Sequence, residues 1–161
     1  MSITVHDINL ADVLHICQHL PESERAVYEK LSGLKYAADH VAAEVFKYRG
    51  MPWVLRDEHG PIVACGFAHQ RDGVLQTWFL ATDRAWSEHG RAVTDWARDT
   101  IKAVLDARLA HRIETLTLAS ETSARQWYAK LGLQHESTLR GYCSNGDDAV
   151  MYVAVRTPES A

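Results

Sequence analysis

The spacing of apolar residues divides the chain into a helical first third and a longer part in which strands and helices alternate. Residues 3–5 predict a short opening strand, and apolar positions three and four apart predict helices over 11–20 and 22–34. A third helical stretch covers residues 36–48, and Gly50 closes it. The first third therefore places helices between one strand and the rest of the chain.

Three strands are predicted next, over 53–56, 62–68 and 74–82. The turns between them carry Asp-Glu-His-Gly at 57–60 and Arg-Asp-Gly at 71–73, which are typical hairpin sequences. We therefore expect these strands to form an antiparallel meander.

The period then returns to that of a helix. A long amphipathic helix, capped by Ser87, is expected before a strand at 112–118 and a helix capped by Ser120. A closing hairpin is expected from strands at 135–142 and 149–155. This order predicts an α/β (α+β mixed) fold, in which helices flank a central mixed, mostly antiparallel sheet.

One strand–helix–strand unit makes two neighbouring strands parallel, with their ends at Thr82 and Leu118. A crevice between such ends is the usual ligand position in α/β folds. We expect a single domain over residues 1–156 and a short tail over 157–161, because the sequence shows no repeat or linker.

Composition narrows the class of protein. The 161 residues carry a net charge of −4 and no cluster of lysine and arginine, which argues against nucleic-acid binding. No apolar run reaches the ~18 residues of a membrane span, and residues 1–5 do not resemble a signal peptide. Cys17, Cys65 and Cys143 are far apart and are expected to be reduced thiols. These features predict a cytoplasmic protein.

The stretch Ser120–Leu133 contains Tyr-Ala-Lys-Leu-Gly at 128–132 and resembles the capped helix of the GNAT family of acetyl-CoA-dependent N-acetyltransferases. Residues 136–152 are similar to the closing hairpin of that family. The resemblance implies acetyl-CoA as cofactor, an amine as acceptor, and Tyr128 as the acid that protonates the departing thiolate. Tyr128 also fits a purely structural role, with its ring buried and its hydroxyl in contact with water.

The resemblance also implies a loop that holds the diphosphate of coenzyme A on backbone N–H groups. The matching stretch is 85–90, in which Gly90 is kept but Glu88 replaces a glycine. Arg84, Arg91 or His89 is expected to offset that carboxylate. The residues expected to bind the cofactor are Leu80, Ala81, Thr82, His89, Gly90, Arg91, Glu121 and Ala124. Glu121 has a structural alternative, because a carboxylate also favours the start of a helix.

A general base has to accept the proton of the attacking amine. His69 and Asp83, each near a strand end, are the candidates, although either also fits an ordinary polar strand end. His15 and His19 have the spacing of two metal ligands but lack a third, so no metal site is expected.

Residues 76–86 are also similar to GNAT-like proteins of tailed bacteriophages, some of them internal virion proteins. That resemblance implies synthesis in a bacterial host cytoplasm, possible packaging in the virion, and protein partners or self-association. Two functions stay open. One is a GNAT-fold protein with a degenerate acetyl-CoA loop, weak or lost N-acetyltransferase activity and a protein-binding role, and the other is an active N-acetyltransferase. Trp86, expected in a polar loop, fits either a lid or a partner contact.

Overall fold

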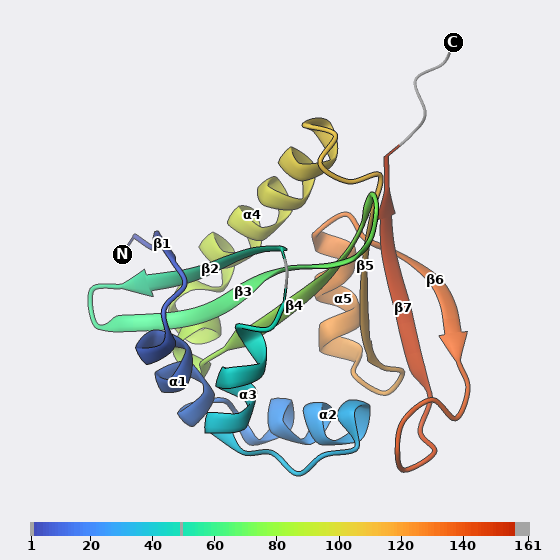
Figure 1. The fold of residues 1–161 in the computed structure, drawn as a ribbon, viewed down its shortest axis with the longest axis horizontal. Helices are drawn as coiled ribbons and strands as arrows, with labels where there is room; N and C mark the ends of the chain where they lie inside the picture. The colour runs from blue at the N-terminus through green and yellow to red at the C-terminus, as the bar shows by residue number, and fades with distance from the viewer. Residues whose placement is uncertain (1, 49, 157–161) are drawn as a thin grey trace.

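The computed structural model describes residues 2–48 and 50–156, so the expected tail at 157–161 lies outside the described residues. Seven strands form one sheet in the order β1-β2-β3-β4-β5-β7-β6 (Figure 1). The β4–β5 pair is parallel and the other pairs are antiparallel, as the sequence predicted. In chain order the elements are β1 (Thr4–Asp7), α1 (Leu10–Gln18), α2 (Glu22–Ser32), α3 (Ala38–Val45), β2 (Gly50–Asp57), β3 (Gly60–Arg71), β4 (Val74–Ala81), α4 (Asp83–Asp106), β5 (Arg112–Leu118), α5 (Thr122–Lys130), β6 (Gln134–Leu139) and β7 (Ala149–Val155).

Helices cover both faces of the sheet (Figure 1). On one face, α1 and α3 pack over Val54 of β2, while α2 packs over Leu118 of β5. On the other, α4 and α5 bury Ile101 and Leu131 against Ile113 of β5. Successive strand residues alternate between these two cores. No helix of the described residues is long and apolar enough to cross a membrane.

The parallel strands β4 and β5 pair at one end only. Their ladder joins three residue pairs, from Val74–Arg112 to Gln76–Glu114, and then stops. Both strands continue, β4 to Ala81 beside β3 and β5 to Leu118 beside β7. The inner edges of residues 77–81 and 115–118 therefore carry backbone N–H and C=O groups that no strand pairing satisfies, which creates an opening in the sheet.

Helix α4 begins earlier than the sequence predicted. Its N-cap is Thr82, in extended conformation directly after β4, and not Ser87. Residues 85–90, expected as a loop, therefore form the first turns of the helix, and Trp86 lies in α4 rather than in a loop. The physical reason is that residues 83–89 lack the glycines and prolines that would hold a loop open, and this stretch also buries Ala85 and His89.

This difference gives a test at Gly90, which lies inside α4 with open space around an added Cβ. We expect Gly90→Ala to raise the free energy of unfolding by about 0.5–1 kcal/mol, because alanine loses less backbone entropy in a helix. Gly66→Ala in β3 is the matched control. Its Cβ would lie 2.5 Å from the Met51 carbonyl oxygen and 2.8 Å from Pro52 Cα, so a loss of about 1–3 kcal/mol is expected. Urea unfolding measures the stability of both variants. Destabilisation by Gly90→Ala would contradict a helical backbone at residue 90.

Candidate functional site

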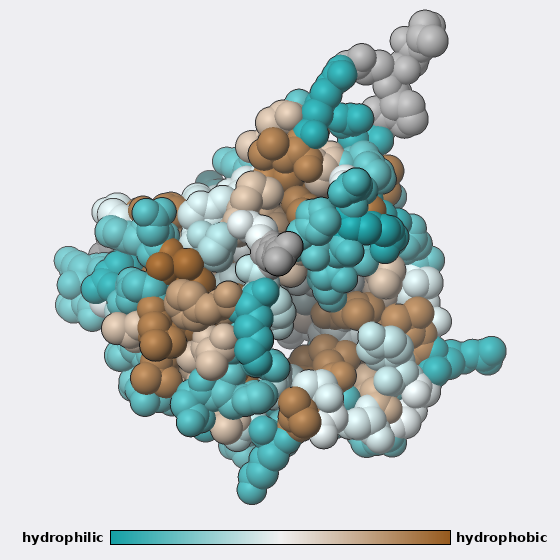
Figure 2. Space-filling view, in the orientation of Figure 1, coloured by the Kyte–Doolittle hydropathy of each residue, from teal (hydrophilic) through white to brown (hydrophobic). Residues whose placement is uncertain are grey.

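A cavity of about 750 Å³ occupies the opening between β4 and β5. Its walls come from α2 and α3 on one face, from α4 and α5 on the other, and from the splayed strands between them. In Figure 2 the surface of the viewed face is hollowed near its centre, with hydrophobic residues around the hollow. The cavity therefore passes from one face of the sheet to the other.

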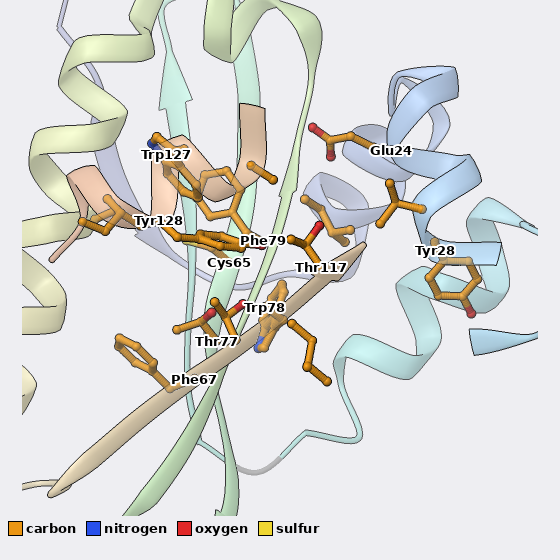
Figure 3. A pocket seen from close by; sticks show the side chains of 18 of the residues that line it. Glu24, Tyr28, Cys65, Phe67, Thr77, Trp78, Phe79, Thr117, Trp127 and Tyr128 are labelled. Atoms are coloured by element: carbon orange, nitrogen blue, oxygen red, sulfur yellow. The ribbon is translucent and has the colours of Figure 1, made fainter. Parts of the chain in front are cut away.

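Aromatic rings form the wall on the α4–α5 side. The ring of Phe79 lies 4.8 Å from that of Trp127 (Figure 3). The ring of Trp86 lies 5.1 Å from that of Trp127. Trp127 also donates a hydrogen bond of 2.9 Å to the Thr94 hydroxyl, which ties α5 to α4. This side of the cavity is therefore rigid and apolar.

Tyr128 lies in this wall, with its ring 5.9 Å from that of Trp127. Burial raises the pKa of the phenol, the hydroxyls of Thr115 and Thr117 on β5 oppose the rise, and the negative charge of Glu24 adds to it. The phenol is therefore protonated at neutral pH, so its proton is available to a leaving group.

Glu24 of α2 enters the cavity from the opposite face. Figure 3 shows its side chain pointing toward Trp127 and Phe79, and its carboxylate accepts a hydrogen bond of 3.4 Å from Trp86 Nε1. Burial raises the pKa of Glu24 to about 7, and hydrogen bonds from Trp86 and from the Ala81 N–H oppose the rise. A carboxylate with a pKa near neutrality is the kind of group that exchanges protons during a reaction.

The sequence analysis missed this residue, although a signal was present. Glu24 lies four residues after Leu20, which precedes α2, and shares the apolar stripe of α2 with Val27 and Leu31, at spacings of three and four residues. A carboxylate within such a stripe faces the interior, where only a specific role or partner offsets its desolvation. An acidic residue in the first turn of a helix also complements the helix dipole, which obscures this signal.

The α2–α3 side of the cavity is apolar apart from its carboxylates. Tyr28, Val45 and Tyr48 line it, with Glu44 as the acidic residue from α3. The Tyr28 hydroxyl is buried without a hydrogen bond of good geometry, although Ser32 and Glu44 lie near enough to influence its pKa, which burial raises. A ligand on this side meets rings, methyl groups and negative charge.

The start of α4 is held by a buried ionic cluster. Asp57, at the end of β2, has a fully buried side chain that accepts hydrogen bonds from Arg84 Nε at 2.9 Å and from His89 Nε2 at 3.1 Å. Burial alone would raise the pKa of Asp57, but the His59 N–H, Arg84 and His89 outweigh it and lower the pKa. The cluster fixes the position of α4 relative to the β2–β3 hairpin.

This cluster engages two of the three groups expected to offset the carboxylate of Glu88. His89 is buried against Asp57, and Arg84 pairs with the same carboxylate. The third, Arg91, has a side chain that is 97% exposed and lies 3.9 Å from Asp95. Gly90 lies within α4. The structure therefore brings none of these four to the cavity.

The other expected residues separate into two groups. Leu80, Glu121 and Ala124 line the cavity, and Ala81 and Thr82 continue β4 along its edge. His69 pairs with Leu75 near the hairpin end of β4 and lies 3.8 Å from Asp72, so it is not among the cavity residues. Asp83 is exposed at the first position of α4, near enough to Glu24 to raise its pKa.

Two groupings of potential metal ligands lie outside the cavity. Asp57, Glu88 and His89 bring their ligand atoms within 4.8 Å of one another, but the guanidinium of Arg84 already supplies positive charge there. His15 and His19 stack with ring centroids 4.3 Å apart, and His19 Nδ1 bonds the His15 carbonyl. Neither grouping indicates a metal centre.

The cavity fits the pantetheine arm of acetyl-CoA but not its diphosphate. The unpaired strand edges at 77–80 and 115–117 offer donors and acceptors to the amide groups of a pantetheine arm. A diphosphate needs free backbone N–H groups or cations, whereas residues 85–90 are helical and Arg84 is paired. The diphosphate-binding loop that the resemblance implied is therefore replaced by helix.

Comparison with known proteins supports the fold. No protein-family model matches the chain, and no curated protein matches it in sequence. A GNAT-family acetyltransferase from Bacillus anthracis superposes with a TM-score of 0.74 and 13% identity, over 97% of this chain and 96% of that one. A variant of the spermidine N-acetyltransferase of Vibrio cholerae gives 0.72 and 12%, over 95% of each chain.

An aminoglycoside acetyltransferase in complex with coenzyme A and kanamycin gives a TM-score of 0.68 and 18% identity, over 96% of this chain and 95% of that one. Likeness at such identities shows the fold, while function depends on the site. The fold class expected from the order of elements is confirmed. This chain has the fold of the GNAT acetyltransferases.

Proposed function

We propose that this protein transfers an acyl group from a thioester to an amine in the β4–β5 cavity. The observation that carries the proposal is the placement of Glu24 and Tyr128, which enter one cavity from opposite faces of the sheet. One is a carboxylate with a pKa of about 7, and the other is a phenol whose pKa is raised. They form a matched proton acceptor and proton donor.

The proton transfers follow from these placements. A thioester supplies the acyl carbon, and the reaction forms a C–N bond while the C–S bond breaks. Glu24 accepts the proton that the attacking amine loses, and Tyr128 donates its proton to the departing sulfur. The hydroxyls of Thr115 and Thr117 stabilise the phenolate that this leaves behind. The apolar rings around Tyr128 exclude water, which would otherwise compete with the amine.

The acceptor side favours an amine with an apolar body. The structural neighbours include enzymes for spermidine and for aminoglycosides, which are polar polycations. Here Val27, Tyr28 and Tyr48 face the acceptor, with Glu24 and Glu44 to attract its charged nitrogen. A primary amine on an aromatic or aliphatic body matches this combination.

Tyr128→Phe tests the proposal. With acetyl-CoA as donor and phenethylamine as acceptor, we expect kcat to fall about 10²-fold, near the low end for proton transfer because a thiolate is a stable leaving group. The loss should shrink with a donor whose thiol is more acidic. Tyr142→Phe, at an exposed tyrosine outside the cavity, is the matched control and should keep full activity. Equal rates for both variants would remove Tyr128 from the mechanism.

A second candidate is a binding protein that has kept the fold but has weak or lost acetyl transfer. Helix in place of the diphosphate loop favours it, together with the acidic residues Asp83 and Glu121 near the cavity. The phage origin and virion role expected from the narrower resemblance stay predictions. Absence of transfer with a broad panel of amines, together with a stable complex with another protein, would favour this candidate.

A further inference from the structure

We infer that the acyl donor is recognised by its pantetheine arm, and that the nucleotide and diphosphate of coenzyme A contribute little or nothing to binding. This inference rests on the proposed function and specifies the donor of that same site. The natural donor is accordingly a thioester on a short, uncharged pantetheine-like arm.

The conformation of residues 82–90 leaves no loop to hold a diphosphate. A diphosphate is bound by N–H groups that a loop leaves free, but α4 begins one residue after β4. The N–H groups from residue 87 onward are therefore used within the helix. The amino end of α4 retains some positive partial charge, which Asp83 in its first turn already complements.

The cations near the starts of α4 and α5 either have other partners or extend into solvent. Arg84 and His89 both bond Asp57, and Arg91 extends into solvent beside Asp95. Arg125, in the first turn of α5, donates to the Ala119 carbonyl at 3.0 Å and to the Tyr152 hydroxyl at 3.4 Å. A diphosphate would have to break one of these hydrogen bonds to gain a counter-charge from Arg84, His89 or Arg125.

Negative charge gathers at the end of the cavity where β4 and β5 terminate. Asp83 follows β4, Glu121 precedes α5, and both raise the pKa of Glu24 through charge repulsion. Asp83 and Glu121 lie at this end of the strand gap, where the diphosphate of a bound coenzyme A would leave it. Like charges brought together oppose binding, so the diphosphate meets repulsion instead of a cradle.

The pantetheine arm of the donor can be bound by uncharged groups of the protein. Backbone groups of residues 77–80 and 115–117 take no part in pairing between β4 and β5, and an extended amide chain can bond those on the inner edges as an added strand does. The rings of Phe79 and Trp127 provide apolar contact along the same path. Recognition therefore concentrates on the part of the donor between the thioester and the phosphate.

Binding of unreactive ligands tests this directly. Calorimetric titration of the wild-type protein with pantetheine and with coenzyme A should give dissociation constants within about tenfold of each other, equal to about 1.4 kcal/mol. Raising NaCl from about 0.05 M to about 0.5 M should tighten coenzyme A binding severalfold and leave pantetheine unchanged, because salt screens the repulsion. Coenzyme A binding that is more than a hundredfold tighter than pantetheine binding, or that weakens with salt, overturns the inference.

The double variant Asp83→Asn, Glu121→Gln supplies a matched comparison. It should tighten coenzyme A binding by about fivefold or more, while pantetheine binding changes less. Equal effects on both ligands would show that these carboxylates do not act on the diphosphate.

Acyl transfer separates the two proposals. Transfer from acetyl-pantetheine and acetyl-CoA at similar kcat/KM supports both. Transfer from acetyl-CoA alone overturns the donor inference and leaves the proposed function standing. Transfer from neither donor, across a panel of apolar amines, overturns the proposed function itself.

Discussion

Glu24→Gln is expected to lower kcat for acyl transfer by about 10³-fold, within the range for removal of a general base. The variant keeps the size of the side chain and its acceptor for Trp86 Nε1, but it cannot take a proton from the amine. Glu22→Gln is the matched control, because Glu22 is an exposed carboxylate at the start of the same helix. It should retain the wild-type kcat within about twofold.

The pH dependence gives a second readout. The wild-type log kcat should rise with pH and level off near pH 7, because Glu24 acts in its ionised form and its pKa is about 7. This bend should be missing from the Glu24→Gln profile. A variant that retains more than a tenth of the wild-type kcat, or that keeps the bend, would contradict the assignment of Glu24 as the base.

Stability should change in the opposite direction to activity. The folded pKa of Glu24 is raised from 4.5 to about 7, so the folded protein holds a proton that the unfolded chain releases between these values. The contribution of this residue to stability is therefore complete below pH 4.5 and declines as the pH rises through 7. Glu24→Gln should melt at a higher temperature than wild type at pH 8 and at about the same temperature at pH 4. A lower melting temperature at pH 8 would mean that the lost activity reflects misfolding.

The fold was largely readable from the sequence because its signals are local. Hairpin turns at 57–60 and 71–73, and the apolar stripe of residues 122–130, lie within single elements. The start of α4 was not readable, because it depends on contacts between distant residues. Asp57 bonds Arg84 and His89, which lie 27 and 32 positions along the chain. A family pattern that expects a loop at 85–90 contains no information about this cluster.

The residues of the candidate site were likewise only partly predictable from the sequence. Tyr128 belongs to a recognisable segment, so the sequence could point to it, and the structure places it in the cavity wall. Glu24 could not be identified in this way, because the pKa of a carboxylate depends on its burial and its neighbours. For Glu24 these come from the packing of α2 against the end of β4. His69 is near the end of a strand, but that end is the hairpin side of β4, away from the cavity.

Asp57→Ala is expected to lower the free energy of unfolding by about 3–5 kcal/mol, the usual cost of removing one partner from a buried ion pair. The side chain of Asp57 is fully buried and that of His89 is 1% exposed, so His89 loses its partner without access to water. The side chain of Arg84 is 31% exposed and regains some hydration, which places the expected loss in the lower half of that range.

Asp106→Ala is the matched control for a salt bridge on the same helix. The pair of Asp106 with Lys102 is exposed, with side-chain exposures of 63% and 74%, so its loss should change the free energy of unfolding far less than the loss of Asp57. Urea unfolding at pH 7 measures both variants.

The acid dependence separates the ionic role of Asp57 from its packing. Because its pKa is lowered below the ordinary 3.8, its ionic contribution is complete above that value and is lost as the pH falls through the folded pKa. Wild type and Asp57→Ala should therefore approach each other in stability below pH 3.8. A loss below about 1 kcal/mol at pH 7 would mean that apolar packing alone holds the start of α4. Arg84 and His89 would then be free to turn toward a bound anion, which would also weaken the case for a donor without a diphosphate.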